Sequence, residues 1–362
     1  MNFDLNQLLE GTGQPGLPEL RDLLRELLGG CQATGRLIEQ HQLSSPHPRV
    51  YRVRFDLNGA VRSLVIKRLE PAVAQRNQLV MSRWLPAVGL RDHGPILLGA
   101  TAERTGKCVW HVYEDLGDWA LNGQAEFLPR VKVAVDLIAQ VHLRFANHVL
   151  LPECRLHGGD FGIGFFVSNV RDAIRCLDAL HGPQMGLEPQ HALLVDGLLA
   201  RLHTLQVEHA ERMQALEELG GPETLLHGDL WTTNAFVIPT NDGLQARLID
   251  WDHAGVGPIS YDLSTFLLRF PCERRLQILE LYREAVAPAG WRLPPSQHLN
   301  LLFETAEYAR FANRIIWPAI ALVQERAEWG FDALAEVEQW FEDWRCVLPE
   351  EIGARPITTV ER

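Results

Sequence analysis

The sequence predicts an α+β fold in two lobes, a small lobe rich in β-strands followed by a larger, mostly α-helical lobe. Three observations support this prediction. Apolar and polar residues alternate over much of residues 1–117, as in half-buried strands. Over residues 118–362 apolar residues recur mostly at helical spacing, interrupted by one hairpin pattern. The 362 residues, of which 46% are hydrophobic, can supply a sizeable core.

The small lobe begins with a helix and continues with strands. Leucines fall on one helical face of residues 19–29, and a glycine pair follows as the stop signal. From Val50, the stretch "VYRVRFDL" alternates and turns through Asn-Gly into "AVRSLVIKRL", which predicts a β-hairpin. We expect a helix over about 72–85, and then strands in "GPILLGA" and "KCVWHVYEDLG".

The large lobe is expected to consist of helices around a single hairpin. Helical spacing marks residues 127–149 and about 188–219, with the glycine-rich loop "HGGDFGIGFF" between them. The hairpin pairs "AFVIP" with "LQARLID" through the turn "TNDG". Residues 262–348 read as almost wholly helical.

Composition excludes several function classes. A net charge of −12 argues against nucleic-acid binding, which depends on clustered Lys and Arg. No run reaches the roughly 18 apolar residues of a membrane span, and the N-terminus has no secretory pattern. The six cysteines are scattered without a C-x-x-C pair. We therefore expect a cytoplasmic protein with neither a nucleic-acid nor a membrane partner. No pattern indicates an oligomeric state.

The stretch "LLHGDLWTTNAFV", residues 225–237, carries the strongest functional signal. Asn234 follows Asp229 by five residues, and Asp250 ends an apolar strand sixteen residues beyond Asn234. Phosphoryl transfer requires a base at the acceptor hydroxyl and hard oxygen ligands for magnesium, which these residue types can provide. Each residue alone has an ordinary structural explanation, such as a turn or a strand end. The combination in this order favours phosphoryl transfer.

Lys67 is the candidate for binding nucleotide phosphates. It ends "SLVIK" in the small lobe, with Val65 on the same strand face. From there Lys67 could reach the phosphates while Val65 packs against a base. Taken alone, Lys67 would more often be a solvated edge-strand lysine.

The motifs "VIK", "HGDLWTTN" and "LIDWD", in that order, resemble those of the aminoglycoside phosphotransferase and choline kinase family, which has a protein-kinase-like fold. The resemblance covers roughly residues 35–345. It implies transfer of the γ-phosphate of ATP, with Mg²⁺, to a hydroxyl of a small molecule. It also implies a catalytic loop at 225–237 and a metal-binding hairpin at 235–252.

The resemblance assigns roles to individual residues of this chain. Asp229 would be the catalytic base, and Asn234 and Asp250 would be the magnesium ligands. Lys67 would contact the α- and β-phosphates. The remaining matches are His227 shaping the catalytic loop, Asp262 bracing it, and Tyr113 and Glu114 in the hinge that meets adenine.

Two departures from the family pattern affect the nucleotide site. Gln78 stands where the helix after Lys67 normally presents a Glu, and an amide cannot neutralise an ammonium group. The phosphate loop "HQLSSPHPRVYRV" lacks a glycine, so Ser44 and Ser45 would supply its donors. A catalytically silent nucleotide-binding regulatory module therefore stays open as an alternative.

Two other interpretations fit the motifs less well. A Ser/Thr protein kinase of the same fold fits less well, because the long helical stretch before the HGD loop suits a small enclosed substrate. Asp160, in "GGDFGIG", belongs to the triplet that protein kinases use for magnesium, but it precedes the HGD loop and follows no apolar strand. We therefore expect Asp250, and not Asp160, to bind the metal.

The C-terminal segment suggests the chemistry of the acceptor. Residues 301–362 contain twelve acidic residues against six arginines and no lysine. Glu304, Glu307 and Tyr308 fall at helical spacing, and tryptophans follow. Carboxylates attract ammonium groups and aromatic faces hold them, so the segment favours an amino-bearing acceptor. The alternative is a solvated acidic helix face.

Overall fold

The computed structural model describes residues 5, 7–29, 35–43, 49–122, 127–182 and 185–349. Contacts divide the chain into two compact units. The first comprises Met1–Asn122, Leu156–Gly158 and Thr232–Ala254, and the second comprises Gly123–Arg155, Gly159–Trp231 and Gly255–Arg362. The sequence predicts a boundary between residues 117 and 118. In the structure, the segment Thr232–Ala254, which contains the second hairpin, also groups with the first unit.

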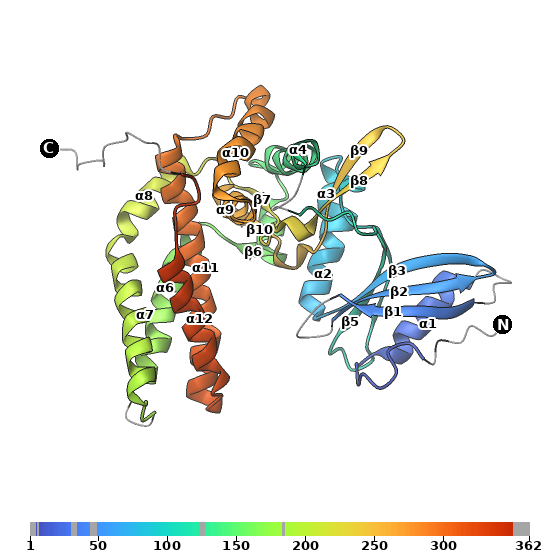
Figure 1. The fold of residues 1–362 in the computed structure, drawn as a ribbon, viewed down its shortest axis with the longest axis horizontal. Coiled ribbons are helices and arrows are strands. Elements are labelled where there is room, and N and C mark those ends of the chain that lie inside the picture. The colour runs from blue at the N-terminus through green and yellow to red at the C-terminus, as the bar shows by residue number, and fades with distance from the viewer. Residues whose placement is uncertain are drawn as a thin grey trace. The chain divides into compact units, whose positions relative to one another are not determined.

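The first unit contains a five-stranded antiparallel sheet of order β1-β2-β3-β5-β4, of which Figure 1 labels β1, β2, β3 and β5. Its strands are β1 Gly35–Gln42, β2 Val50–Leu57, β3 Ala60–Leu69, β4 Leu97–Ala102 and β5 Val109–Glu114. The predicted hairpin is confirmed as β2 and β3, which turn at Asn58 and Gly59 with φ of 55° and 87°. Both angles are positive, as a two-residue Asn-Gly turn requires.

The predicted leading helix is confirmed as α1, Leu17–Leu28, and its leucine face packs against the sheet. Leu20, Leu24 and Leu28 are buried in one cluster with sheet residues such as Phe55 and Ile66. After β3 the chain forms α2, Pro71–Leu79, which continues through a π-helical turn, Val80–Trp84, into α3, Leu85–Ala87. This confirms the helix expected over 72–85.

The second hairpin consists of β8, Ala235–Thr240, and β9, Gly243–Leu248, as predicted. Short 3₁₀ turns flank it at Thr232–Asn234 and Trp251–His253. Its backbone bonds to the chain that follows the five-stranded sheet. The Leu121 N–H donates to Ala235 O at 2.9 Å, and the Val237 N–H donates to Trp119 O at 3.0 Å. These bonds explain why the hairpin belongs to the first unit.

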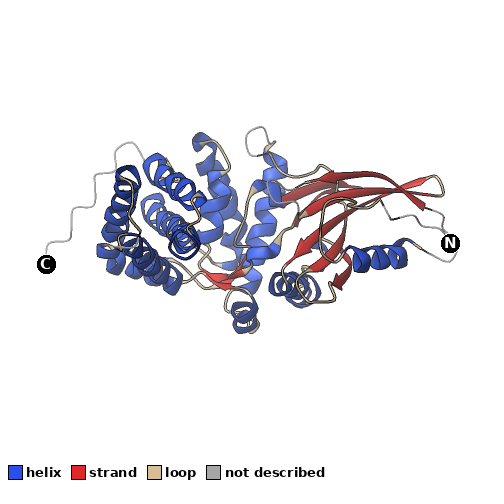
Figure 2. Cartoon of the chain, turned by 90° about the horizontal axis from the view of Figure 1, so that it is seen from below, coloured by secondary structure: helices blue, strands red, loops and turns tan. Residues whose placement is uncertain are grey.

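Helices dominate the second unit, whereas strands are prominent in the first (Figure 2). Its helices are α4 Leu128–Phe145, α5 Leu151–His157, α6 Ile163–Leu180, α7 Pro189–Val207, α8 His209–Leu219, α9 Ser260–Leu268, α10 Cys272–Val286, α11 Ser296–Glu325 and α12 Trp329–Asp343. Helix α11 is central, since it packs against α6, α8, α9 and α12. Sequence patterns did not identify α6. Within the described part of the chain, every helix is too short or too polar to span a membrane.

A small three-stranded sheet lies inside the second unit, in the order β6-β10-β7. The strands are β6 Gly159–Asp160, β7 Thr224–Leu226 and β10 Gly255–Gly257. Gly255 is required there, because a Cβ atom at this position would lie 2.5 Å from Gly159 O. The sheet fixes β7, and the HGD loop leaves the end of β7.

Candidate active site

A cavity of about 470 Å³ lies within the first unit. Its size falls in the range of small-ligand pockets. Apolar side chains from the sheet and the second hairpin line much of it, among them Val50, Val65, Phe236 and Ile249. The polar lining includes Lys67, Asn77, Asn234 and Asp250. The cavity thus combines an apolar wall with a charged, polar part.

Lys67 occupies β3 opposite His111 of β5 and makes two ion pairs. Its Nζ lies 2.5 Å from Asp250 Oδ1 and 2.7 Å from Asp252 Oδ1. Burial lowers the pKa of Lys67, but the carboxylates of Asp250 and Asp252 outweigh it, so the pKa is raised above its ordinary value. Lys67 is therefore a largely enclosed, charged group, with a side chain that is 12% exposed, and not a solvated edge lysine.

Asn234 and Asp250 meet at the open end of the β8–β9 hairpin. Ala235 pairs with Leu248, so the residues just outside this pair lie together. The Ile249 N–H donates to Asn234 O at 2.9 Å, which closes this end of the hairpin. An amide and a carboxylate oxygen are ligands that Mg²⁺ takes, so this donor set fits the predicted metal. The backbone of Asp250 is left-handed, with φ 64° and ψ 57°.

The structure corrects the residue of α2 that faces this cluster. Gln78 is exposed, whereas Asn77 is buried and lines the cavity. Adjacent helical residues point about 100° apart, so a shift of one position changes the face. Asn77 shares its buried face with Ala74 and Val80, at intervals of three residues. That apolar spacing was available in the sequence and would have selected Asn77.

The hinge after β5 is tied to the sheet. Tyr113 is buried and lines the cavity together with Glu114, whose N–H donates to Ile96 O at 3.0 Å. Asp115 Oδ2 accepts from Ser63 Oγ at 2.6 Å and pairs with Arg52 at 2.9 Å. The hinge is therefore held by side chains as well as by backbone. Ser44 and Ser45, predicted for the phosphate loop, lie outside the described residues.

The HGD loop belongs to the second unit and is held by Asp262 in the first turn of α9. Asp262 accepts the N–H groups of His227 and Gly228 at 2.7 and 2.9 Å. His142 Nε2 lies 3.3 Å from Asp262, and His142 Nδ1 lies 2.9 Å from the Tyr282 hydroxyl. Burial raises the pKa of Asp262, but the bonds and charges of His142 and His227 outweigh it and lower the pKa. A buried carboxylate thus fixes the loop that leads into Asp229.

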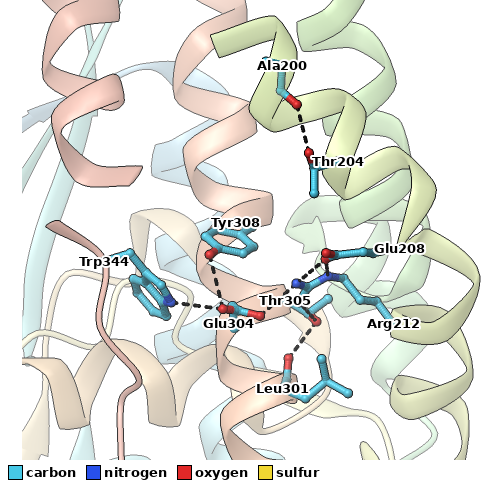
Figure 3. Close-up of polar contacts among 9 residues, drawn as sticks. All are labelled: Ala200, Thr204, Glu208, Arg212, Leu301, Glu304, Thr305, Tyr308 and Trp344. Carbon is cyan, nitrogen blue, oxygen red and sulfur yellow. Dashed lines mark hydrogen bonds and ion pairs between the residues drawn. The ribbon is translucent and has the colours of Figure 1, made fainter. Parts of the chain in front are cut away.

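Two of the predicted acceptor residues on α11, Glu304 and Tyr308, make contacts within the protein (Figure 3). Glu304 Oε2 pairs with Arg212 of α8 at 2.8 Å. Glu304 Oε1 accepts from the Tyr308 hydroxyl and from Trp344 Nε1, both at 3.2 Å. The Arg212 guanidinium lies 5.2 Å from the centre of the Tyr308 ring. The cation that we expected at this aromatic and acidic cluster is supplied by the chain itself.

Glu307 is likewise neutralised inside the second unit. Its Oε1 pairs with Arg310 and accepts from Ser264 Oγ at 2.6 Å. Arg310 also lies 3.6 Å from the centre of the Tyr261 ring. The helical spacing of the acidic residues therefore reflects packing between α11, α8 and α9.

A comparison with family models identifies the family of this chain. Residues 47–294 match a family model described as the phosphotransferase enzyme family. This chain belongs to that family. It is a kinase, a phosphotransferase with an alcohol group as acceptor. No curated protein is a significant match to this phosphotransferase.

Solved structures share the fold of this phosphotransferase at low identity, which confirms the predicted fold class. A spectinomycin phosphotransferase in complex with ADP and spectinomycin is 15% identical, with a TM-score of 0.53 over 89% of this chain and 96% of that one. The choline kinase LicA from Streptococcus pneumoniae is 12% identical, with a TM-score of 0.50 over 89% and 99%. An ethanolamine kinase from Plasmodium vivax is 14% identical, with a TM-score of 0.50 over 80% and 78%.

Sequence reasoning missed three residues around the candidate site of this phosphotransferase. Asp252 pairs with Lys67, although the sequence analysis assigned only Asp250 of this segment to the site, as a metal ligand. Asn77 contacts Asp252, and His142 contacts Asp262. Asp252 was detectable, because it lies two residues after Asp250 in "LIDWD". His142 gave no comparable signal, since it sits among apolar residues in the middle of a predicted helix.

Proposed function

We propose that this phosphotransferase moves the γ-phosphate of ATP, with Mg²⁺, to a hydroxyl group of a small molecule. The observation that carries the proposal is the set of Lys67, Asn234 and Asp250 lining one apolar cavity. An apolar wall suits a nucleotide base, and a cation beside carboxylate and amide oxygens suits phosphates with their metal. The bound ADP of the spectinomycin phosphotransferase supports a nucleotide as donor.

Each residue has one task in this proposal. Asn234 and Asp250 hold the metal, and Lys67 contacts the α- and β-phosphates. Bound Mg²⁺ would neutralise charge on the phosphates. Asp229 accepts the proton of the acceptor hydroxyl, while Asp262 keeps its loop in place through the His227 amide.

A more specific proposal is that the acceptor carries an amino group. The contacts of Glu304 and Glu307 are not sufficient to support it. Glu307 pairs with Arg310, but Arg212 is shared between Glu304 and Glu208 at 2.8 and 2.6 Å, so that cluster keeps one net negative charge. Selectivity for amino groups would have to come from this remaining charge or from other carboxylates. A panel of acceptors therefore has to contain neutral compounds as well as amino compounds.

The test is an ATP-consumption screen of amino alcohols, aminoglycosides, sugars and nucleosides, with mass spectrometry of each product. For an acceptor that is turned over, Asp229→Asn should lower kcat by about 100-fold or more, because general-base help is lost, and should leave nucleotide affinity nearly unchanged. Asp160→Asn serves as the control and should retain turnover. Full turnover by the Asp229→Asn enzyme would show that Asp229 is structural.

A further inference from the structure

We propose that Asp252, oriented by Asn77, is the permanent carboxylate partner of Lys67 and holds the lysine in place while Asp250 binds the metal. The inference rests on the proposed function, because it assigns Asp250 to the metal. It makes Asp252 and Asn77 positioning residues for the group that contacts the phosphates.

The hydrogen bonds of Asn77 fix the direction of Asp252. Asn77 Nδ2 donates to Asp252 Oδ1 at 2.9 Å and to Val73 O at 3.0 Å, which uses both amide hydrogens. Asn77 is only 2% exposed, so its amide has little freedom to turn. The same Asp252 oxygen accepts from Lys67 Nζ at 2.7 Å. One carboxylate oxygen therefore joins α2 to the lysine of β3.

The backbone of Asp252 is anchored to the same helix. Arg76 donates to Asp252 O, and Arg76 Nε also donates to His157 O at 2.9 Å. Adjacent residues of α2 thus hold both the side chain and the carbonyl of Asp252. Asp250, in contrast, has a side chain that is 40% exposed, against 25% for Asp252. The more exposed carboxylate is the one suited to exchange Lys67 for a metal.

Charge balance gives the physical reason for two carboxylates. Lys67 is largely enclosed, with a side chain that is 12% exposed, and a buried ammonium group without a partner is costly. If Asp250 alone balanced Lys67, the lysine and the metal would compete for one carboxylate. With Asp252 in place, Lys67 keeps one partner in both states. An amide at position 77 suits this arrangement, since a carboxylate there would face Asp252 and repel it.

The test compares ADP binding by calorimetry in wild type and Asp252→Asn at saturating Mg²⁺, where the metal engages Asp250, with melting temperature as a check of folding. Losing the carboxylate that holds Lys67 should weaken ADP binding there by about 10-fold or more, and by less without Mg²⁺, because Asp250 then still pairs with Lys67. Adding Asn77→Glu to Asp252→Asn returns a carboxylate from α2 and should recover most of that loss. Adding Gln78→Glu instead places the same charge on the exposed side of α2 and should recover nothing.

Several outcomes would overturn the inference. Unchanged ADP affinity in a folded Asp252→Asn protein would remove Asp252 as the partner of Lys67. An unchanged affinity at saturating Mg²⁺ combined with a higher half-saturating Mg²⁺ concentration would show that Asp252 is a metal ligand. If Asp252→Asn does not fold, Asp252→Glu and Asn77→Leu replace it. Asp252→Glu should bind ADP better than Asn77→Leu, and the reverse order would refute the inference. Failure of wild type itself to bind ADP would instead refute the proposed function.

Discussion

At the scale of single residues, the left-handed backbone of Asp250 decides how its role can be tested. A non-glycine residue with φ 64° pays a steric penalty of roughly 1 kcal/mol or more, and Asp and Asn tolerate this conformation best. Asp250→Ala would therefore combine lost metal binding with a strained backbone. Asp250→Asn keeps the shape and removes only the charge.

We predict that Asp250→Asn weakens Mg²⁺-dependent nucleotide binding by about 10-fold or more, because a charged metal ligand becomes a neutral one. A thermal-shift titration with Mg-ATP measures the effect. Asp160, which pairs with Arg155 at 3.2 Å, provides the matched control, and Asp160→Asn should bind Mg-ATP as wild type does. If Asp160→Asn weakens Mg-ATP binding and Asp250→Asn does not, Asp160 is the metal ligand.

At the scale of elements, strand β5 carries a buried histidine that makes the fold sensitive to acid. Burial, and then the charge of Lys67, lower the pKa of His111 to about 4. The folded state thus favours the neutral ring, so its contribution to stability is complete above the unfolded pKa of about 6.5 and declines as pH falls from there toward 4.

We predict that the free energy of unfolding falls by about 3 kcal/mol from this histidine alone between pH 6.5 and pH 4. Urea unfolding at pH 7.5 and pH 4.5 measures the difference. His111→Gln should reduce that difference, whereas His203→Gln, on the exposed side of α7, should not. Equal pH dependence in wild type and His111→Gln would rule out His111 as the origin of acid sensitivity.

Helix α11 gives the second prediction at this scale. Glu307→Gln leaves the largely enclosed Arg310 without its charge partner and should lower the free energy of unfolding by about 3 kcal/mol, measured by urea unfolding. The ratio of kcat/KM for amino-bearing and neutral acceptors should stay constant. Glu342→Gln, at a side chain that is 55% exposed, should change stability by no more than about 0.5 kcal/mol. If Glu307→Gln lowers kcat/KM only for amino-bearing acceptors and leaves the free energy of unfolding unchanged, Glu307 belongs to the acceptor site.

At the scale of the whole molecule, the sequence predicted the elements whose signals are local. Both hairpins carry alternating residues around a turn, and the leucine face of α1 is visible in its own residues. Strand β1 escaped prediction because most of its residues are exposed, so no apolar alternation marks it. The strands of the small sheet are too short, at two or three residues, to show any period.

The same distinction between local and distant signals applies to the candidate site. Asn234 and Asp250 lie in one hairpin, and their spacing alone predicted that they meet. The partners of Glu304 and Lys67 could not be predicted in this way. Arg212 is 92 residues from Glu304, and Asp252 is 185 residues from Lys67. Such ion pairs depend on how α8 meets α11 and how the hairpin meets β3, which no local pattern encodes.

The grouping of Thr232–Ala254 with the first unit has a consequence for synthesis on the ribosome. The sheet is complete by residue 122, but its last segment ends at residue 254, which is 132 residues later. At bacterial and eukaryotic elongation rates of 5–20 residues per second, this interval lasts about 7 to 26 s. Throughout it, Lys67 exists without the two carboxylates that later pair with it. The first unit of this phosphotransferase therefore lacks part of its packing during this interval, and the lining of its cavity is complete only when most of the chain has been made.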